Sequence, residues 1–148
     1  MFRIFTLFVL FSPLSVNAGA LDGKSLVCEP IPSTDPYSSL RTTWFLFGPN
    51  HVNQYLVGSD EVEDLGKMAI TETANAVTWK YMNAFPWSLD RKTLTLTNPA
   101  QIAVNAATGK RLIWQYECEV LLTKEEFFAR IEAYRLNKRL ELMKGNKI

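Results

Sequence analysis

Residues 76–97, which read AVTWKYMNAFPWSLDRKTLTLT, constrain the fold more than any other stretch of the chain. Val77, Trp79 and Tyr81 alternate with more polar neighbours, and this is the period of a β-strand with one apolar face. Two shorter alternating runs follow. The apolar residues of the first, Trp87 and Leu89, have odd numbers, and those of the second, Leu94 and Leu96, have even numbers. The polar residues 90–93 separate these runs and begin with aspartate, which is favoured at the first position of a tight turn. The stretch therefore predicts a β-meander.

Five more segments are predicted strands: residues 24–29, 41–47, 51–57, 67–73 and 111–120. The segment 41–47 is apolar on both faces, which predicts a strand that is covered on both sides. Proline, glycine and clustered polar residues predict connections between strands, at 30–40, 59–66 and 98–110. Short connections between consecutive strands favour an antiparallel arrangement.

The end of the chain predicts one α-helix over residues 124–143. Thr123 and Glu126 have the spacing of a capping box, which marks a helix start. The helix carries one apolar stripe, made of Phe127, Ile131 and Tyr134. A closed barrel hides only one face of the doubly apolar segment 41–47, so we expect this stripe to dock on the other face.

Cys28 and Cys118 are the only cysteines, and they lie in the first and last predicted strands. In an exported protein, two cysteines imply one disulfide. The bond would close a loop of about 90 residues, for which chain entropy predicts a stabilisation on the order of 4 kcal/mol. Two unpaired buried thiols are the alternative. A bond between the first and last strands is easiest if those strands are neighbours, as they are in a closed or nearly closed barrel.

The predicted fold class is therefore mainly β. We expect about eight short antiparallel strands in a lipocalin-like meander barrel, closed or nearly closed, with one C-terminal α-helix. A β-sandwich of two sheets is the alternative. Residues 21–148 form a single domain in this interpretation, because the chain contains no internal repeat, low-complexity tract or linker.

Residues 1–20 are predicted to be a cleaved signal peptide. Arg3 supplies the positive start, residues 4–11 are almost uniformly apolar, and small residues at Ala18 and Ala20 suit cleavage. The apolar run is too short to remain as a membrane span, so the protein is expected to be periplasmic or secreted without stable membrane insertion. Removal of Arg3 leaves equal numbers of basic and acidic side chains. A neutral domain has no long-range field for nucleic acid.

The inventory of reactive side chains argues against an enzyme, a metal site and a cofactor. His51 is the only histidine, and no paired metal-ligand spacing, nucleophile elbow or glycine-rich phosphate loop occurs. The acidic segment 59–66 lacks the alternating oxygen ligands of a calcium loop, so it is interpreted as a solvated loop. The basic residues of the predicted helix are interpreted as a solvated face because acidic residues dilute them.

Four aromatic residues on inward-facing positions are the candidate ligand-binding set: Trp79, Tyr81, Trp114 and Tyr116. Aromatic rings inside a small barrel usually fill its core, and less often they line a pocket for an apolar or aromatic ligand. Both interpretations are open at this point.

The order of several motifs resembles a group of small uncharacterised exported proteins of marine bacteria. The carriers are Val77 and Trp79, then Asp90, Arg91, Lys92, Thr93, Leu94 and Leu96, and finally Tyr116 and Cys118. This resemblance covers the second half of the predicted sheet and implies no activity. In size, export and disulfide alone, the chain is also similar to small periplasmic lysozyme-inhibitor barrels.

Two functions follow as expectations. The first is a non-enzymatic exported barrel that binds a small apolar or aromatic ligand. The alternative is a protein inhibitor or envelope accessory factor that acts through its loops on a protein partner. An internal cavity would favour the first function, and a filled core with a projecting conserved loop would favour the second.

Overall fold

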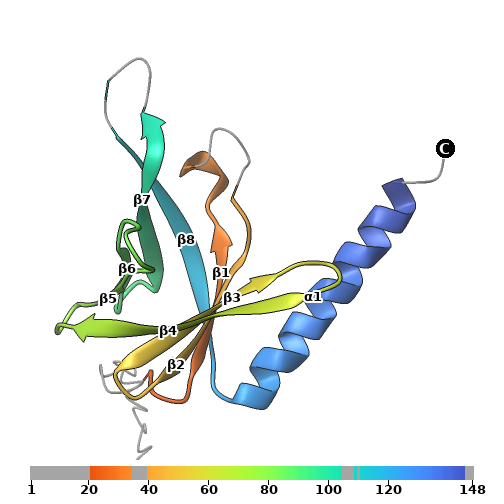
Figure 1. The fold of residues 1–148 in the computed structure, drawn as a ribbon, viewed down its shortest axis with the longest axis horizontal. Helices are drawn as coiled ribbons and strands as arrows, with labels where there is room; N and C mark the ends of the chain where they lie inside the picture. Colours follow the sequence, from red (N-terminus) through yellow and green to blue (C-terminus); the bar gives the residue numbers. More distant parts are fainter. Residues whose placement is uncertain (1–20, 35–39, 105–108, 110, 146–148) are drawn as a thin grey trace, which may run out of the picture.

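The chain forms a closed barrel of eight antiparallel strands in sequence order, with one C-terminal helix (Figure 1). The structure is a computed structural model that describes residues 21–34, 40–104, 109 and 111–145, without the side chains of 99–104, 111 and 112. The strands are β1 (Ser25–Pro30), β2 (Thr43–Gly48), β3 (His51–Val57), β4 (Val62–Glu72), β5 (Ala76–Trp79), β6 (Trp87–Asp90), β7 (Thr95–Val104) and β8 (Arg111–Leu121). The predicted meander barrel is confirmed, and the sandwich alternative is wrong because β1 pairs with β8 and closes the sheet.

The disulfide lies in the β1–β8 ladder that closes the barrel. Cys28 and Cys118 are direct cross-strand partners, with their Cα atoms 4.0 Å apart, and their sulfur atoms are bonded. The predicted pairing is confirmed. The bond joins two positions that are 90 residues apart in the sequence, so it fixes the two ends of the sheet to each other.

Strand β4 starts earlier than the sequence predicts, and most of the expected acidic loop at 59–66 is part of it. β4 pairs with β3, and the register shifts between Asn53 and Tyr55. Gly66, opposite this shift, has a φ of 88°, which glycine adopts without the steric cost that other residues pay. Such an irregularity inserts a residue and breaks the alternation of side chains. The alternation of apolar and polar residues that marks a strand is therefore absent from residues 62–66, and the sequence predicts a loop there.

Strand β7 likewise runs through part of the segment 98–110, which the sequence predicts to be a connection. Asn98 pairs with Trp114 and Pro99 with Ile113, before the register shifts. Proline cannot donate to a ladder, but it is tolerated at strand irregularities. Long-range pairing with β8 thus overrides the local turn signal at Asn98-Pro99. The predicted connection at 30–40 falls partly outside the described residues.

Two separate apolar cores cover the two faces of the barrel wall. The inner core is enclosed by the strands and contains Leu26, Cys28, Phe45, Phe47, Val52, Met68, Val77, Trp79, Leu89, Leu96 and Tyr116, with Leu21 at one end. The outer core lies between β1, β2 and the helix α1, and contains Val27, Trp44, Leu121, Phe127 and Ile131. Neighbouring residues of one strand enter different cores because strand side chains alternate between faces.

Helix α1 (Lys124–Gly145) begins and docks as predicted. The Thr123 hydroxyl accepts a hydrogen bond from the Glu126 amide at 3.1 Å, as in a capping box. The Glu126 carboxylate accepts from the Leu122 amide at 3.2 Å, one residue before the expected partner. Phe127 and Ile131 are fully buried in the outer core, and Tyr134 packs against it. The first half of the helix is therefore part of the folded domain.

The predicted signal peptide, residues 1–20, lies outside the described residues. Within the described part of the chain, no helix is long and apolar enough to cross a membrane.

Candidate functional site

The structure brings the four candidate ligand-binding residues to one cluster inside the barrel. Trp79 on β5 and Tyr116 on β8 are buried in the inner core. Tyr81 and Trp114 are half-buried and pack against the same core. Tyr81 follows the end of β5, so the predicted strand stops two residues before it. The inward direction predicted for the tryptophans and tyrosines is therefore correct.

Three further aromatic residues, Phe45, Phe47 and Trp87, complete this cluster and were not among the candidates. The Phe45 ring lies edge-on to Trp79 and to Trp87, with centroids 5.0 and 5.7 Å apart. Phe47 packs on Trp79 at 5.6 Å, and Trp87 packs on Tyr116 at 5.6 Å. Edge-to-face pairs at these distances are favourable contacts in their own right. In the described part of the barrel, these rings therefore form one connected cluster within the inner core.

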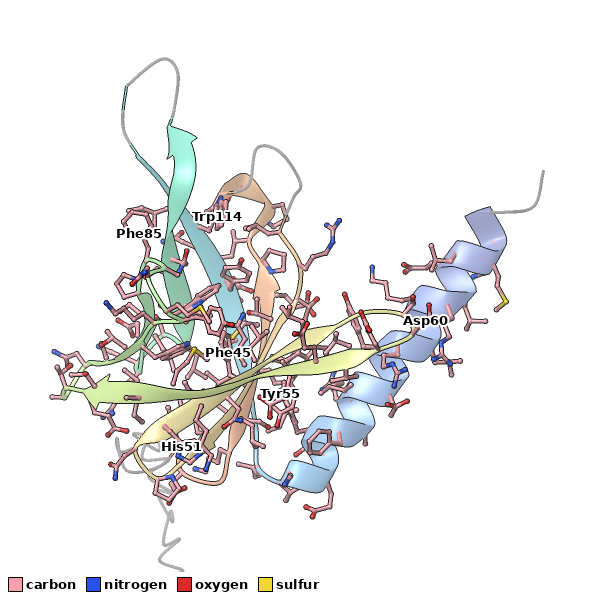
Figure 2. All side chains as sticks on the ribbon, in the orientation of Figure 1. Phe45, His51, Tyr55, Asp60, Phe85 and Trp114 are labelled. Atoms are coloured by element: carbon pink, nitrogen blue, oxygen red, sulfur yellow. A yellow bond between two sulfur atoms is a disulfide. The ribbon has the colours of Figure 1, made fainter. Side chains whose placement is uncertain are left out.

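Two indole groups of the cluster have donors without an acceptor. The Nε1 atoms of Trp79 and Trp114 are buried and have no hydrogen-bond partner among the described residues. A buried N–H without a partner costs free energy, so a carbonyl or carboxylate brought close to either nitrogen would be stabilised. Figure 2 shows Trp114 at the same end of the barrel as Phe85, and His51 at the opposite end. The half-buried Trp114 therefore lies toward the end of the barrel that is opposite the β2–β3 turn.

A second candidate site is a groove of about 660 Å³ on the outside of the barrel. It lies between the second half of α1 and the end of β3. The residues that line it are Arg41, Val57, Gly58, Ser59, Tyr134, Lys138, Glu141, Leu142 and Gly145. The side chains combine an apolar patch with two cations and one carboxylate. Nothing in the local sequence signals the groove, because its walls come from segments that are about 80 residues apart.

Two arginines attach the β3–β4 turn to the helix and so hold the groove in shape. Arg135 donates through Nη2 to the backbone oxygen of Asp60 at 2.6 Å. Arg139, one turn further along, donates through Nε to the backbone oxygen of Ser59 at 2.8 Å. The Arg139 Nε also lies 3.5 Å from the Asp60 carboxylate. Figure 2 shows Asp60 at the tip of the hairpin, beside the helix. Arg135 and Arg139 therefore hold the helix against the hairpin, which is a structural role for two of the basic residues on α1.

Tyr55 on β3 and Asp90 on β6 have pKa values that the folded structure shifts from their ordinary values. Burial, and then the nearby Asp64 carboxylate, raise the pKa of the Tyr55 phenol above its ordinary 10.0. Tyr55 packs on Phe127 at 5.4 Å, so a neutral phenol remains in the outer core. Backbone hydrogen bonds from Thr93 and Lys92 lower the pKa of Asp90 below its ordinary 3.8. The folded state therefore favours the neutral phenol of Tyr55 and the ionised carboxylate of Asp90.

His51, the only histidine of the sequence, lies at a turn of the barrel. His51 starts β3, and its Nδ1 atom lies 3.0 Å from the Pro49 carbonyl in the β2–β3 turn. Asn50 in the same turn has a φ of 62°, as the predicted tight turn requires. Among the described residues, no three histidine, cysteine or acidic side chains come together in a way that could hold a metal ion.

No known family model, curated protein or solved structure matches the chain. The fold defines the protein as a small disulfide-closed β-barrel with a docked C-terminal helix.

Proposed function

We propose that this protein is a non-enzymatic, exported binding protein whose partner is another protein, held in the groove beside α1. One contrast carries the proposal. The described interior of the barrel is packed with its own aromatic rings, whereas the groove is open at the surface. An interior packed with its own rings supports the inhibitor or accessory function over the carriage of a small ligand.

The chemistry of the groove suits a segment of a protein chain. Val57, Tyr134 and Leu142 offer apolar surface, and Leu142 is 58% exposed. Arg41 and Lys138 border this surface. The partner segment we expect has an apolar side chain next to a carboxylate, because apolar burial supplies affinity and charge complementarity supplies orientation.

Two observations support the exported location. The Cys28–Cys118 disulfide is of the kind that persists in an oxidising compartment. The apolar start of the chain, with Arg3 before it, has the pattern of a secretory signal. A periplasmic or secreted barrel that binds a protein would act as an inhibitor or as an accessory factor of the envelope.

The second candidate function is the binding of a small apolar or aromatic ligand inside the barrel. The unpartnered indole donors of Trp79 and Trp114 favour it. Such a ligand would have to carry an acceptor and displace part of the ring cluster formed with Trp87 and Tyr116. That displacement has an energetic cost, which is why this candidate comes second.

Native mass spectrometry of the protein purified from its own periplasm or secretions separates the two functions. We expect a retained protein, which after separate purification rebinds the barrel with one partner per groove. Titration calorimetry should then show at least tenfold weaker binding for Leu142→Glu, which places a carboxylate in the groove. Leu136→Glu is the matched control, because it changes the same residue type on the opposite face of the same helix.

A retained small molecule that quenches the buried tryptophans would overturn the proposal in favour of the interior site. Equal binding of the partner by the wild type and by Leu142→Glu would show that the groove is not the contact surface.

A further inference from the structure

Helix α1 has a second apolar face, which points away from the barrel. It consists of Ala129, Ala133, Leu136, Leu140 and Met143, all of them exposed. The three larger residues are 56%, 40% and 59% exposed, in chain order. The docked residues Phe127 and Ile131 lie two positions earlier, which is about 200° around the helix. The protein therefore presents a long apolar stripe, here called the outer stripe, that the barrel does not cover.

The spacing of the outer stripe is that of a helix-pairing seam. Successive members are four, three, four and three residues apart, which is the spacing of the a and d positions in a heptad repeat. A helix that only covers a barrel needs one apolar face, with polar residues opposite. The second face therefore has no role within this domain, and its regular spacing indicates that it packs against another helix.

The order of sizes within the stripe specifies that other helix. Small residues, Ala129 and Ala133, stand at one end, and large residues, Leu140 and Met143, stand at the other. In an antiparallel pair with a two-fold axis beside Leu136, each residue faces the one equally far past Leu136 in the second copy. Met143, seven residues after Leu136, then faces Ala129, seven residues before it, and Leu140 lies within one residue of the position opposite Ala133. Each large side chain fills the space that an alanine leaves.

The charges beside the stripe fit the same arrangement. Glu132 lies four residues before Leu136 and Arg139 three residues after it, on the same side of the stripe. In antiparallel pairs, residues on the same flank of the two helices meet, so Glu132 lies next to Arg139 of the second copy. The two-fold axis creates this pair twice. Within one chain, Glu132 pairs with Arg135 and Arg139 pairs with Asp60. The side chains of Glu132 and Arg139 are 67% and 47% exposed, so each can also contact a charge of the second copy.

A parallel pair fits the same residues poorly. It would place alanine against alanine at one end and methionine against methionine at the other, so the helices would have to diverge along the seam. The contact from Ala129 to Met143 is about 21 Å long at 1.5 Å per residue. Size matching therefore favours the antiparallel pair on both sides of Leu136, which faces its own copy in either arrangement.

We propose that two copies of this chain associate through the outer stripes of their α1 helices, as an antiparallel, two-fold symmetric pair centred on Leu136. The contact is isologous, so the assembly closes at two copies. The stripe and the groove lie on opposite faces of the helix. The dimer therefore leaves both grooves accessible, and the inference does not rest on the proposed function.

Sedimentation equilibrium over a range of concentrations tests the association with protein expressed from the 148-residue sequence. We expect the wild type to dimerise, and Leu136→Glu to weaken dimerisation at least tenfold by placing two carboxylates together at the axis. Leu142→Glu should dimerise like the wild type, because it lies on the groove face. A wild type that stays monomeric up to about 100 μM, or equal loss in both variants, would overturn the proposal.

Cysteine cross-linking tests the direction of the pair and does not depend on the Leu136→Glu variant folding. Ala129→Cys combined with Met143→Cys should give a covalent dimer on mild oxidation, and Met143→Cys alone should not. Within one chain these positions are about 21 Å apart, too far for a disulfide. Cross-linking by Met143→Cys alone would show a parallel pair and contradict the proposal.

The competing occupant of the stripe is a lipid surface, because basic residues also flank it. Flotation with vesicles of anionic phospholipid addresses this. Monomeric protein that floats with the vesicles, and loses this property on Leu136→Glu, would replace the dimer with membrane binding.

Discussion

Trp44 and Phe45 are neighbours on β2, and their rings are buried in different cores. Trp44 faces outward, with its ring centroid 6.1 Å from that of Phe127 on the helix. Phe45 faces inward, with its centroid 5.0 Å from that of Trp79. The barrel wall at β2 is therefore covered on both sides. Loss of the helix contacts would expose one of the largest buried side chains of the domain.

Substitution of Phe127 by alanine should destabilise the protein by about 3–5 kcal/mol, the usual range for a core phenylalanine. Its ring is fully buried against Trp44 and Tyr55. Chemical denaturation measures the change in the free energy of unfolding. Phe128→Ala is the matched control, because its ring is more exposed, and it should cost less than about 1 kcal/mol. A change within about 0.5 kcal/mol for Phe127→Ala would mean that the helix is not docked in solution.

Removal of the disulfide should cost about 2–5 kcal/mol. The bond closes a loop between positions 90 residues apart, so the oxidised unfolded chain is strongly restricted. The double variant Cys28→Ala and Cys118→Ala avoids free thiols, and urea unfolding compares it with the oxidised wild type. Non-reducing peptide mapping of the wild type should recover the two cysteines in one linked peptide pair. Recovery of both as free thiols would refute the bond.

Removal of the arginine contacts at the hairpin should loosen the second half of α1 and leave the barrel intact. Arg135→Ala loses a bond to the Asp60 carbonyl, and we expect a cost of about 1 kcal/mol. Hydrogen exchange should become faster at residues 138–145 and stay unchanged around Ile131. Arg130→Ala is the control, because it breaks an exposed ion pair between the first half of the helix and Glu119 on β8. Unchanged exchange beyond residue 138 would show that the arginines do not support the helix.

The Asp90 turn should make stability depend on pH in the acidic range. The folded state lowers the pKa of Asp90 below 3.8, because the carboxylate accepts backbone hydrogen bonds. The ionised form is thus favoured by folding, so its contribution is complete above 3.8 and is lost as pH falls through the lowered pKa. The difference in unfolding free energy between the wild type and Asp90→Asn should shrink over that interval. A difference that is the same at every pH would contradict this.

Much of the fold follows from local pattern. The alternation around Val77 and Trp79, the capping residue Thr123 and the apolar stripe through Phe127 each depend on residues that are close in sequence. Their periods match strand and helix geometry directly. Cys28 and Cys118 add one long-range constraint. A disulfide between the first and last predicted strands predicts closure of the barrel without any knowledge of which strands pair.

The candidate site was predictable only in part. The inward direction of Trp79 and Tyr116 follows from strand parity. Whether such rings line a pocket or fill the core depends on how closely they meet Phe45 and Trp87, which come from other strands. The groove beside the helix had no local signal at all, because its two walls are distant segments.

The sequence by itself determined part of every strand, which of the candidate rings face inward, and where the helix begins, because each property depends on near neighbours in the chain. The tertiary structure alone decided the register shift opposite Gly66, the extension of β7 through Pro99 and the filling of the interior. These features depend on the fit between segments that are far apart in sequence. Pairing energy and ring packing across the barrel can therefore outweigh a local turn signal or a break in the alternation.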